Sequence, residues 1–376
     1  MIRPVLEIPA LEPIPAEEVG SIAVVKPDHI GDLILHTPVF PALRRRFPKA
    51  RITAVVGTWA AEALRNNPHV DEIVAFTPEW LDRDRVRFDL AKHRRNQEAL
   101  ARLAAKPFDL VINLRDEGEA VSYLNLSVNA LLTGRWFLSY VKDHAELAMV
   151  SHPVAYRYER MHVLDRAKAL LRAIGVEVDG LPALYPSAED TAQAEALLGG
   201  KRYWVALAPG AGWPGKRWPS ENFLALAAAL QERGIPFLAL GGKAEAGVAE
   251  EMEKRFGALN LCGKTTLLSA AAVLGKVAVV VNSDSAAAHM GAAMGARAIN
   301  IMQPTARVEF VPLGRKEADV VSYDDCINSC RLWFFGRDPK EAILPCECVE
   351  GIGVERVRRA VFQALIDAYD AGELEG

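Results

Sequence analysis

The sequence predicts an α/β protein made of two Rossmann-like domains with a cleft between them. Its 376 residues exceed the usual length of one domain. Short apolar runs alternate with longer amphipathic segments, and this alternation begins twice, near residue 22 and again near residue 203. Such alternation implies right-handed crossovers and a parallel sheet covered on both faces. Ligands are then expected beyond the carboxyl ends of the strands.

The first half begins with an irregular leader over residues 1–20, which contains several prolines. Apolar runs of five or six residues predict four strands, at 22–26, 51–56, 72–76 and 109–113. Helical spacing of apolar residues predicts helices at 33–47, at 59–66 and around 94–105. The first of these ends on three arginines, which oppose the helix dipole, and Pro38 marks either its first turn or a kink.

The second half repeats the pattern. Strands are expected at 203–208, 236–240, 277–281 and 297–302, and helices at 220–233, 244–256, 266–274 and 285–294. Ser220 is a suitable N-cap, and Gly234 ends the same helix. The expected domains are residues 1–180 and 181–353, joined by a proline-containing hinge at 181–190. An amphipathic helix over 354–371 is expected to pack back on the first domain, so that residues 354–376 form a terminal element.

The composition excludes several classes of protein. Lys and Arg number 44 against 48 Asp and Glu, a net charge of −4, whereas nucleic-acid-binding proteins usually carry a basic excess. No apolar run reaches the length of a membrane span, and the leader lacks the basic start of a signal peptide. We therefore expect a cytoplasmic protein, with peripheral contact at the inner membrane left open.

A glycine-rich loop follows the first strand of the second half. Residues 210–215 read GAGWPG and match the dinucleotide pattern G-x-G-x-x-G. Pro214 interrupts that pattern, however, and the next strand ends in Gly-Gly-Lys, where an acid should hold the ribose. The glycines still allow backbone N–H groups to approach an anion, and Lys216 and Arg217 suit a phosphate. The alternative is that both cations lie on a solvated loop.

Two further loops carry acidic residues at strand ends. Asp284 and Ser285 precede a helix whose first N–H groups can bind an anion, and His289 lies one turn later. Asp32, after Gly31, lies at the end of the first strand, where a carboxylate can act as a general base. Taken alone, each acidic residue can equally be a helix cap.

Taken together, these motifs resemble glycosyltransferase family 9, the ADP-heptose:lipopolysaccharide heptosyltransferases. The matching stretches occur in the family's order and cover nearly the whole chain after residue 20: residues 26–43 (KPDHIGDLILHTPVFPAL), 51–76, 109–114, 162–176 (HVLDRAKALLRAIGV), 209–219 (PGAGWPGKRWP), 240–245 (LGGKAE), 261–264, 282–295 (NSDSAAAHMGAAMG) and 302–305.

The resemblance implies the two-domain GT-B fold and an inverting transfer that needs no metal. It also implies that the second domain holds a nucleotide-sugar donor. It assigns the general base to Asp32, the diphosphate cation to Lys216 and a donor-sugar contact to Asp284. The remaining donor-binding candidates are Gly210, Gly212, Glu245 for the ribose, Ser285, Ala286 and His289. Ala286 replaces the family's usual glycine, and Ala211 and Gly212 stand where some members carry hydroxyl residues.

The expected function is therefore transfer of a heptose or similar sugar from ADP-heptose, or another nucleotide sugar, to an acceptor hydroxyl in lipopolysaccharide core biosynthesis. The acceptor could instead be a protein, another glycan or a small molecule. Two other classes remain: a non-catalytic nucleotide-sugar-binding protein and an NAD-dependent oxidoreductase. No cofactor is expected for catalysis.

Four of the five cysteines cluster as Cys326, Cys330, Cys346 and Cys348. Four thiolates suit tetrahedral zinc or iron, although the spacing differs from the usual C-x2-C pair. Some protein-modifying members of the resembled family hold iron with four cysteines. Reduced thiols or disulfides are the alternatives, and a metal here would be structural.

Overall fold

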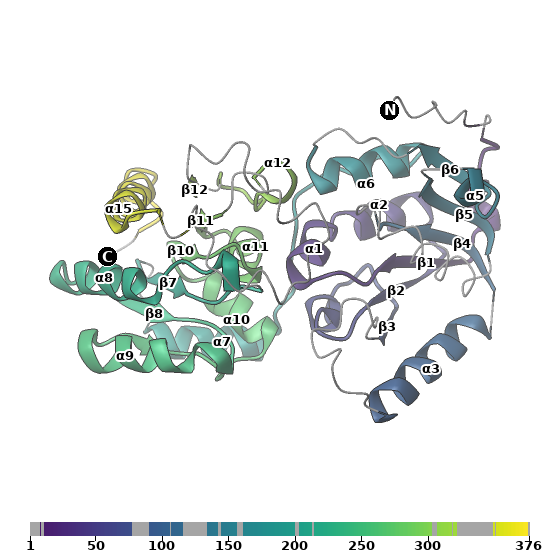
Figure 1. Ribbon diagram of the computed structural model, residues 1–376. Helices are drawn as coiled ribbons and strands as arrows, with labels where there is room; N and C mark the ends of the chain where they lie inside the picture. The colour runs from purple at the N-terminus through teal and green to yellow at the C-terminus, as the bar shows by residue number, and fades with distance from the viewer. Residues whose placement is uncertain are drawn as a thin grey trace. The chain divides into compact units, whose positions relative to one another are not determined.

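The computed structural model describes residues 8, 11–76, 90–105, 107–115, 134–141, 144–155, 161–199, 203–212, 214–302, 307–317, 319–321, 349 and 351–374. The chain divides into two compact units, Met1–Gly180 and Leu181–Gly376. Figure 1 shows the sheet and helices of each unit, and each unit is described here by itself.

The first unit is built on a six-stranded sheet in the order β3-β2-β1-β4-β5-β6. All its neighbouring strands pair in parallel. The strands are β1 Ser21–Lys26, β2 Arg51–Gly57, β3 Glu72–Phe76, β4 Phe108–Asn113, β5 Gly134–Val141 and β6 His152–Ala155.

Both faces of this sheet are buried, as a parallel sheet requires. Ala23 and Val25 on one face of β1 pack in one cluster with Ala99 and Leu103 of α3. The alternate residues of β1, on the other face, are equally buried. The unit's helices are α1 Ile30–Leu35, α2 Val39–Arg46, α3 Leu90–Ala104, α5 His144–Leu147 and α6 Val163–Arg172, with 3₁₀ turns at Ala16–Glu18 and Ala61–Leu64.

Two predictions for the first unit need correction, and two of its strands were missed. The helix expected at 59–66 is only the 3₁₀ turn Ala61–Leu64, because Asn66, Asn67 and Pro68 follow it and favour turns over helix. The helix expected at 33–47 is two helices, and Pro38 is the N-cap of the second. Strands β5 and β6 were not predicted at all.

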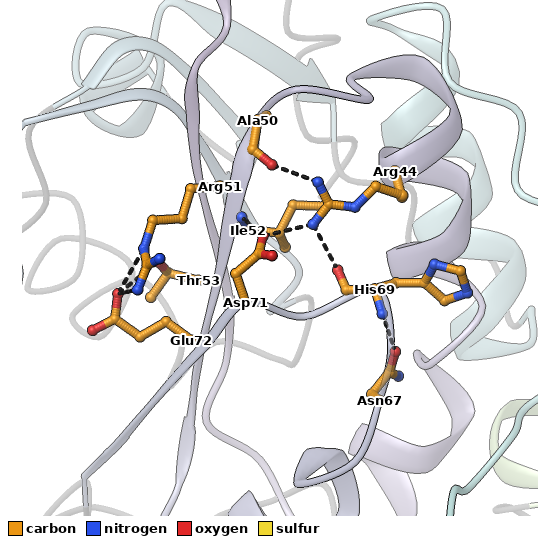
Figure 2. Close-up of polar contacts among 9 residues, drawn as sticks. All are labelled: Arg44, Ala50, Arg51, Ile52, Thr53, Asn67, His69, Asp71 and Glu72. Carbon is orange, nitrogen blue, oxygen red and sulfur yellow. Dashed lines mark hydrogen bonds and ion pairs between the residues drawn. The ribbon is translucent and has the colours of Figure 1, made fainter.

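The amino ends of β2 and β3 are tied to the end of α2 by one arginine (Figure 2). Arg44 donates to the carbonyl oxygen of Ala50 at 2.6 Å and to that of His69 at 3.4 Å, and it pairs with Asp71 at 2.6 Å. Asp71 also accepts the backbone N–H of Ile52 at 2.7 Å. Burial alone would raise the pKa of Asp71, but this N–H and the Arg44 guanidinium together lower it.

The second unit repeats the architecture of the first. Its strands are β7 Val205–Ala208, β8 Phe237–Ala239, β9 Leu259–Asn260, β10 Val279–Asn282, β11 Arg297–Ile301 and β12 Asp319–Val321. They form a parallel sheet in the order β12-β11-β10-β7-β8-β9. Counted within each unit, both sheets therefore have the Rossmann order 3-2-1-4-5-6.

Two groups of helices cover this second sheet. α8 contacts α9 and α15, while α10 contacts α7 and α11. The core between the sheet and α8, α9 and α15 includes the fully buried Trp218, whose ring packs edge-on against Phe223 at 5.0 Å between ring centroids. The helices are α7 Ala188–Leu198, α8 Ser220–Glu232, α9 Ala246–Phe256, α10 Leu267–Leu274, α11 Ala286–Met294, α12 Arg307–Phe310 and α15 Val354–Asp370, with 3₁₀ turns at Pro214–Lys216 and Lys243–Glu245.

The terminal helix corrects another expectation. We expected residues 354–376 to pack back on the first domain. In the structure the buried face of α15, with Val357, Val361 and Ala364, belongs to the core of the second unit. Its amphipathic pattern identifies the face that is buried but carries no information about the partner of that face.

Candidate functional site

The predicted donor-binding residues of the second unit gather at the centre of its sheet. β7 and β10 are neighbours there, and the chain leaves them toward opposite edges of the sheet, which makes this a topological switch point. Open α/β sheets bind ligands in the crevice at such a point. Gly210, Gly212 and Lys216 follow β7, and Asp284, Ser285 and Ala286 follow β10.

Lys216 and Asp284 form an ion pair across this switch point. Their Nζ and Oδ2 atoms are 2.7 Å apart, and the side chains are 19% and 6% exposed. The structure thus brings together two residues that lie 68 positions apart in the chain. The carboxylate fixes the position of the lysine, whose side chain remains partly exposed.

The backbone at Asp284 turns sharply into α11. Its φ is +44°, the only positive φ of a non-glycine residue among those described. Aspartate tolerates this left-handed region better than most residues. Two buried asparagines hold the turn: Asn300 Oδ1 accepts from Asp284 N at 3.2 Å, and Asn282 Oδ1 accepts from Ser285 N at 3.1 Å. The turn starts α11 at Ala286, beside the switch point, and the first N–H groups of a helix favour an anion.

The loop that carries Lys216 is anchored by Trp218. The Trp218 backbone N–H donates to Ser283 Oγ at 3.1 Å, and its indole N–H donates to the Ile352 carbonyl at 2.7 Å. Ser283 directly precedes Asp284 in the chain. The hydrogen bond from the Trp218 backbone N–H to Ser283 therefore couples the positions of Lys216 and Asp284.

Glu245 reaches the same loop from the neighbouring strand connection. Its Oε2 accepts the Gly242 N–H at 2.9 Å. A Cβ atom on Gly210 would lie 2.7 Å from Glu245 Cδ, and one on Gly241 would lie 3.1 Å from Glu245 Cβ. Glycine at 210 therefore leaves room for this side chain as it lies, whereas a Cβ at 241 would require it to shift by a few tenths of an ångström.

The structure locates the other predicted site residues, while their roles stay predictions. His289 is buried in the second turn of α11, and Ala286 is the first residue of that helix. Gly212 lies half-buried in the loop after β7, whereas Arg217 is exposed. The role of Arg217 as a phosphate ligand stays a prediction.

Asp32 belongs to the first unit, at the corresponding switch point between β1 and β4. It is the third residue of α1 and half-buried. Its backbone carbonyl accepts a hydrogen bond from His36 Nδ1 at 2.7 Å. The structure thus places Asp32 at the carboxyl edge of one sheet and the donor-binding candidates at the carboxyl edge of the other.

Sequence reasoning missed a buried ionic cluster beside Asp32. Asp28 lies between Lys26, at 3.1 Å, and Arg115, also at 3.1 Å, and these side chains are only 2–4% exposed. Burial would raise the pKa of Asp28, but the charges of Lys26 and Arg115 lower it, so the carboxylate is ionised. The signal for this cluster in the sequence is Lys26, a charged residue at the end of an otherwise apolar strand.

The neighbouring His36 is neutral. Burial and the charge of Lys26 lower its pKa to about 3. Because the Asp32 carbonyl oxygen can only accept, Nδ1 of His36 carries the proton.

The pKa of His36 predicts how stability depends on pH. Below about pH 6.5 the unfolded chain binds a proton at this residue and the folded protein does not. This part of the stability is therefore complete above pH 6.5 and is lost as the pH falls toward 3. We expect the free energy of unfolding to fall by about 1 kcal/mol more between pH 7 and 5.5 in the wild type than in His36→Asn. Urea unfolding at both pH values measures this, and equal losses would contradict it.

The four clustered cysteines lie outside the described residues. Among those the structure describes, no group of three or more His, Cys, Asp or Glu side chains is placed to bind a metal ion. Within the same residues, no helix has the length and apolar character needed to cross a membrane.

Comparison with known proteins gives one family. The model of glycosyltransferase family 9 (heptosyltransferase) matches residues 98–331, more than half of the chain. Lipooligosaccharide heptosyltransferase 2 of Haemophilus ducreyi is 26% identical over 300 residues, which cover 73% of this chain and 80% of that protein.

Two solved structures share the fold. A glycosyltransferase family 9 protein of Veillonella parvula superposes with a TM-score of 0.70 at 20% identity, over 93% of this chain and 99% of that one. The E. coli ADP-heptose LPS heptosyltransferase II does so with a TM-score of 0.68 at 18% identity, over 93% and 99%. The fold is thus GT-B, with two Rossmann-like units, and the chain belongs to glycosyltransferase family 9, the heptosyltransferases.

Proposed function

We propose that this glycosyltransferase moves a heptose from ADP-heptose to a hydroxyl of a lipopolysaccharide core, with inversion at the anomeric carbon. The observation that carries the proposal is the Lys216–Asp284 pair, set at a Rossmann switch point beside the start of α11. The printed names of the H. ducreyi relative and of the E. coli structure support the sugar and the acceptor class.

The second unit holds the donor in this proposal. Lys216 and the first N–H groups of α11 face the diphosphate, Asp284 contacts the sugar, and Glu245 accepts hydrogen bonds from the ribose. Positive charge held near the diphosphate stabilises the leaving group as its bond to the sugar breaks. Because Lys216 and the helix supply this charge, we propose that no divalent metal is required.

The first unit supplies the base. Asp32 takes the proton from the acceptor hydroxyl while the acceptor oxygen bonds to the anomeric carbon. The bond between that carbon and the phosphate oxygen breaks, and ADP leaves with the electron pair. The attacking and leaving groups lie on opposite faces of the sugar, so the configuration inverts. A lipid-linked core would be met by peripheral contact at the cytoplasmic face of the inner membrane.

The close approach of Gly210 to Glu245 yields a test of the donor site. Gly210→Ala should displace the carboxylate and weaken ADP binding by about 10- to 100-fold, the value of a hydrogen bond to a charged group. Gly247→Ala is the control, because its Cβ meets nothing within 4 Å and it lies in helix α9. Isothermal calorimetry with ADP compares the two. Equal affinities would remove Glu245 from the site.

The donor itself is tested by thermal unfolding with a panel of nucleotides. A ligand at about 100 times its Kd stabilises the folded state by about 2.7 kcal/mol. ADP-heptose and ADP should raise the melting temperature, whereas UDP-glucose and NAD should not. Stabilisation by NAD would favour an oxidoreductase. Stabilisation by ADP-heptose without release of ADP in the presence of any acceptor would favour a non-catalytic binding protein.

A structural metal held by Cys326, Cys330, Cys346 and Cys348 is a separate proposal, which rests on the residue types. Elemental analysis of untagged protein should find about one zinc or iron per chain. The fifth cysteine, Cys262, is excluded from this set because it is buried and its thiol pKa is raised to about 12. Less than about a tenth of an equivalent, with four further thiols titrating in the denatured chain, would favour reduced cysteines.

A further inference from the structure

The two units use their switch points differently. In the second unit the pair across the switch point leaves its lysine 19% exposed. In the first unit the Lys26–Asp28–Arg115 cluster lies at the carboxyl ends of β1 and β4, and its side chains are only 2–4% exposed. The cluster therefore lies at the edge of the sheet where Rossmann units commonly bind ligands, close in the chain to Asp32.

The cluster ties one short loop to the ends of three strands. Lys26 is the last residue of β1 and also donates to the Leu114 carbonyl, just after β4, at 3.5 Å. Arg115 follows Leu114. Trp59 lies two residues after the third strand, β2, and its indole N–H donates to the backbone carbonyl of Asp28 at 2.8 Å. Asp28 is thus held from three sides, two residues before α1 begins.

Asp32 is fixed from the other end of α1 as well. The backbone N–H of His36 donates to the carbonyl oxygens of Leu33 and Ile34. It does not form the regular α-helical hydrogen bond to the carbonyl oxygen of Asp32, four residues earlier. The His36 imidazole takes that place, with Nδ1 at 2.7 Å from the Asp32 oxygen. The chain is therefore held on both sides of Asp32, by the contacts of Asp28 before α1 and by the hydrogen bond from His36 after it.

Stability alone does not account for this arrangement. Burying three charged groups carries a large desolvation cost, and well-packed apolar side chains of similar volume are usually as stable or more so. The ionic cluster instead fixes the position of Asp28, because this residue pairs with two cations and its carbonyl accepts a hydrogen bond from Trp59.

We propose that Asp28, held by Lys26 and Arg115, and His36 are positioning residues that fix the orientation of Asp32 toward the acceptor hydroxyl. This inference rests on the proposed function, in which Asp32 is the general base. A displacement of a catalytic group by about 1 Å can cost on the order of 100-fold in rate.

The test compares two identical substitutions in the first unit. Asp28→Asn should lower kcat by about 10- to 100-fold and leave the Kd for ADP unchanged, since ADP is expected to bind the other unit. Asp71→Asn is the matched control. Asp71 also pairs with an arginine and a backbone group, but at the amino edge of the sheet (Figure 2). The Asp71→Asn enzyme should have a lower free energy of unfolding than the wild type and an unchanged kcat. A folded Asp28→Asn enzyme with wild-type kcat would overturn the proposal.

Two further variants keep the test decisive if Asp28→Asn fails to fold. Lys26→Met leaves the Asp28–Arg115 pair with balanced charge and should still lower kcat. His36→Leu should lower kcat, and His36→Asn should recover most of it because its amide can donate to the same carbonyl. Wild-type kcat in both Lys26→Met and His36→Leu would contradict the positioning role.

Hydrogen exchange gives a readout that needs no activity. Amides of residues 30–36 should exchange at least about tenfold faster in Lys26→Met and His36→Leu than in the wild type, and no faster in Asp71→Asn. Unchanged exchange in this segment would overturn the proposal. Failure of the wild type to turn over ADP-heptose, with the expected exchange pattern, would instead overturn the proposed function.

Discussion

Asp32→Asn should abolish most of the transfer activity, with kcat falling by about 100- to 10,000-fold, the usual contribution of a general base. Asparagine keeps the shape and the helix position but cannot take the proton of the acceptor hydroxyl. The Kd for ADP should be unchanged, because the donor-binding candidates belong to the second unit. A quenched-flow assay of ADP release, together with calorimetry, measures both quantities.

Asp165→Asn is the matched control for this substitution. Asp165 is the third residue of α6, as Asp32 is of α1, and it lies in the same unit. If Asp32 served only to place a negative charge in the first turn of its helix, the two variants would lose similar stability and no activity. An Asp32→Asn enzyme with wild-type kcat would therefore leave Asp32 only the role of an acidic residue in the first turn of α1.

Lys216→Ala should lower kcat by about 100- to 1000-fold, as the loss of one charge stabiliser typically does. The change also leaves Asp284, which is 6% exposed, without its cation beside the diphosphate. Donor binding should weaken for the same reason. Lys216→Arg keeps the charge and should retain more activity. Steady-state kinetics with ADP-heptose as the varied substrate separates kcat from KM.

The pairing with Asp284 allows a sharper test of the same residue. If repulsion by the orphaned carboxylate contributes to the defect, Lys216→Ala with Asp284→Asn should bind ADP more tightly than Lys216→Ala alone. Lys254→Ala is the control, because that exposed lysine pairs with Glu250 on α9. Unaltered kcat and KM in Lys216→Ala would remove this residue from the diphosphate site.

Eight of the twelve described strands, all except β5, β6, β9 and β12, could be predicted with the loops that follow them because their signals are local. An apolar run followed by glycines, a lysine or an aspartate is visible in a few consecutive residues. That was enough to identify Lys216 and Asp284, whereas Glu245 was assigned only through the resemblance to the family. The structure brings all three to one end of the second sheet. Their assignment to a donor site also required the ordered resemblance to a family.

The ionic cluster of the first unit could not be predicted because its members are distant in sequence. Asp28 and Arg115 are 87 positions apart, and only the order of β1 and β4 in the sheet makes them neighbours. A charged residue in a sequence is normally taken as solvated, whereas both side chains are buried here. The partner of α15 was missed for the same reason, since packing between distant elements leaves no local pattern.

We propose that ADP-heptose bound by the second unit donates its sugar to an acceptor deprotonated by Asp32. The most direct measurement is NMR of the product formed from ADP-heptose and a heptose-deficient lipopolysaccharide core, with the purified wild type and Asp32→Asn compared in the presence of EDTA. We expect the wild type to release ADP and form a product of inverted anomeric configuration, and Asp32→Asn to form almost none. A retained configuration, equal product from both enzymes, or no product from the wild type unless a divalent metal is supplied would contradict this mechanism.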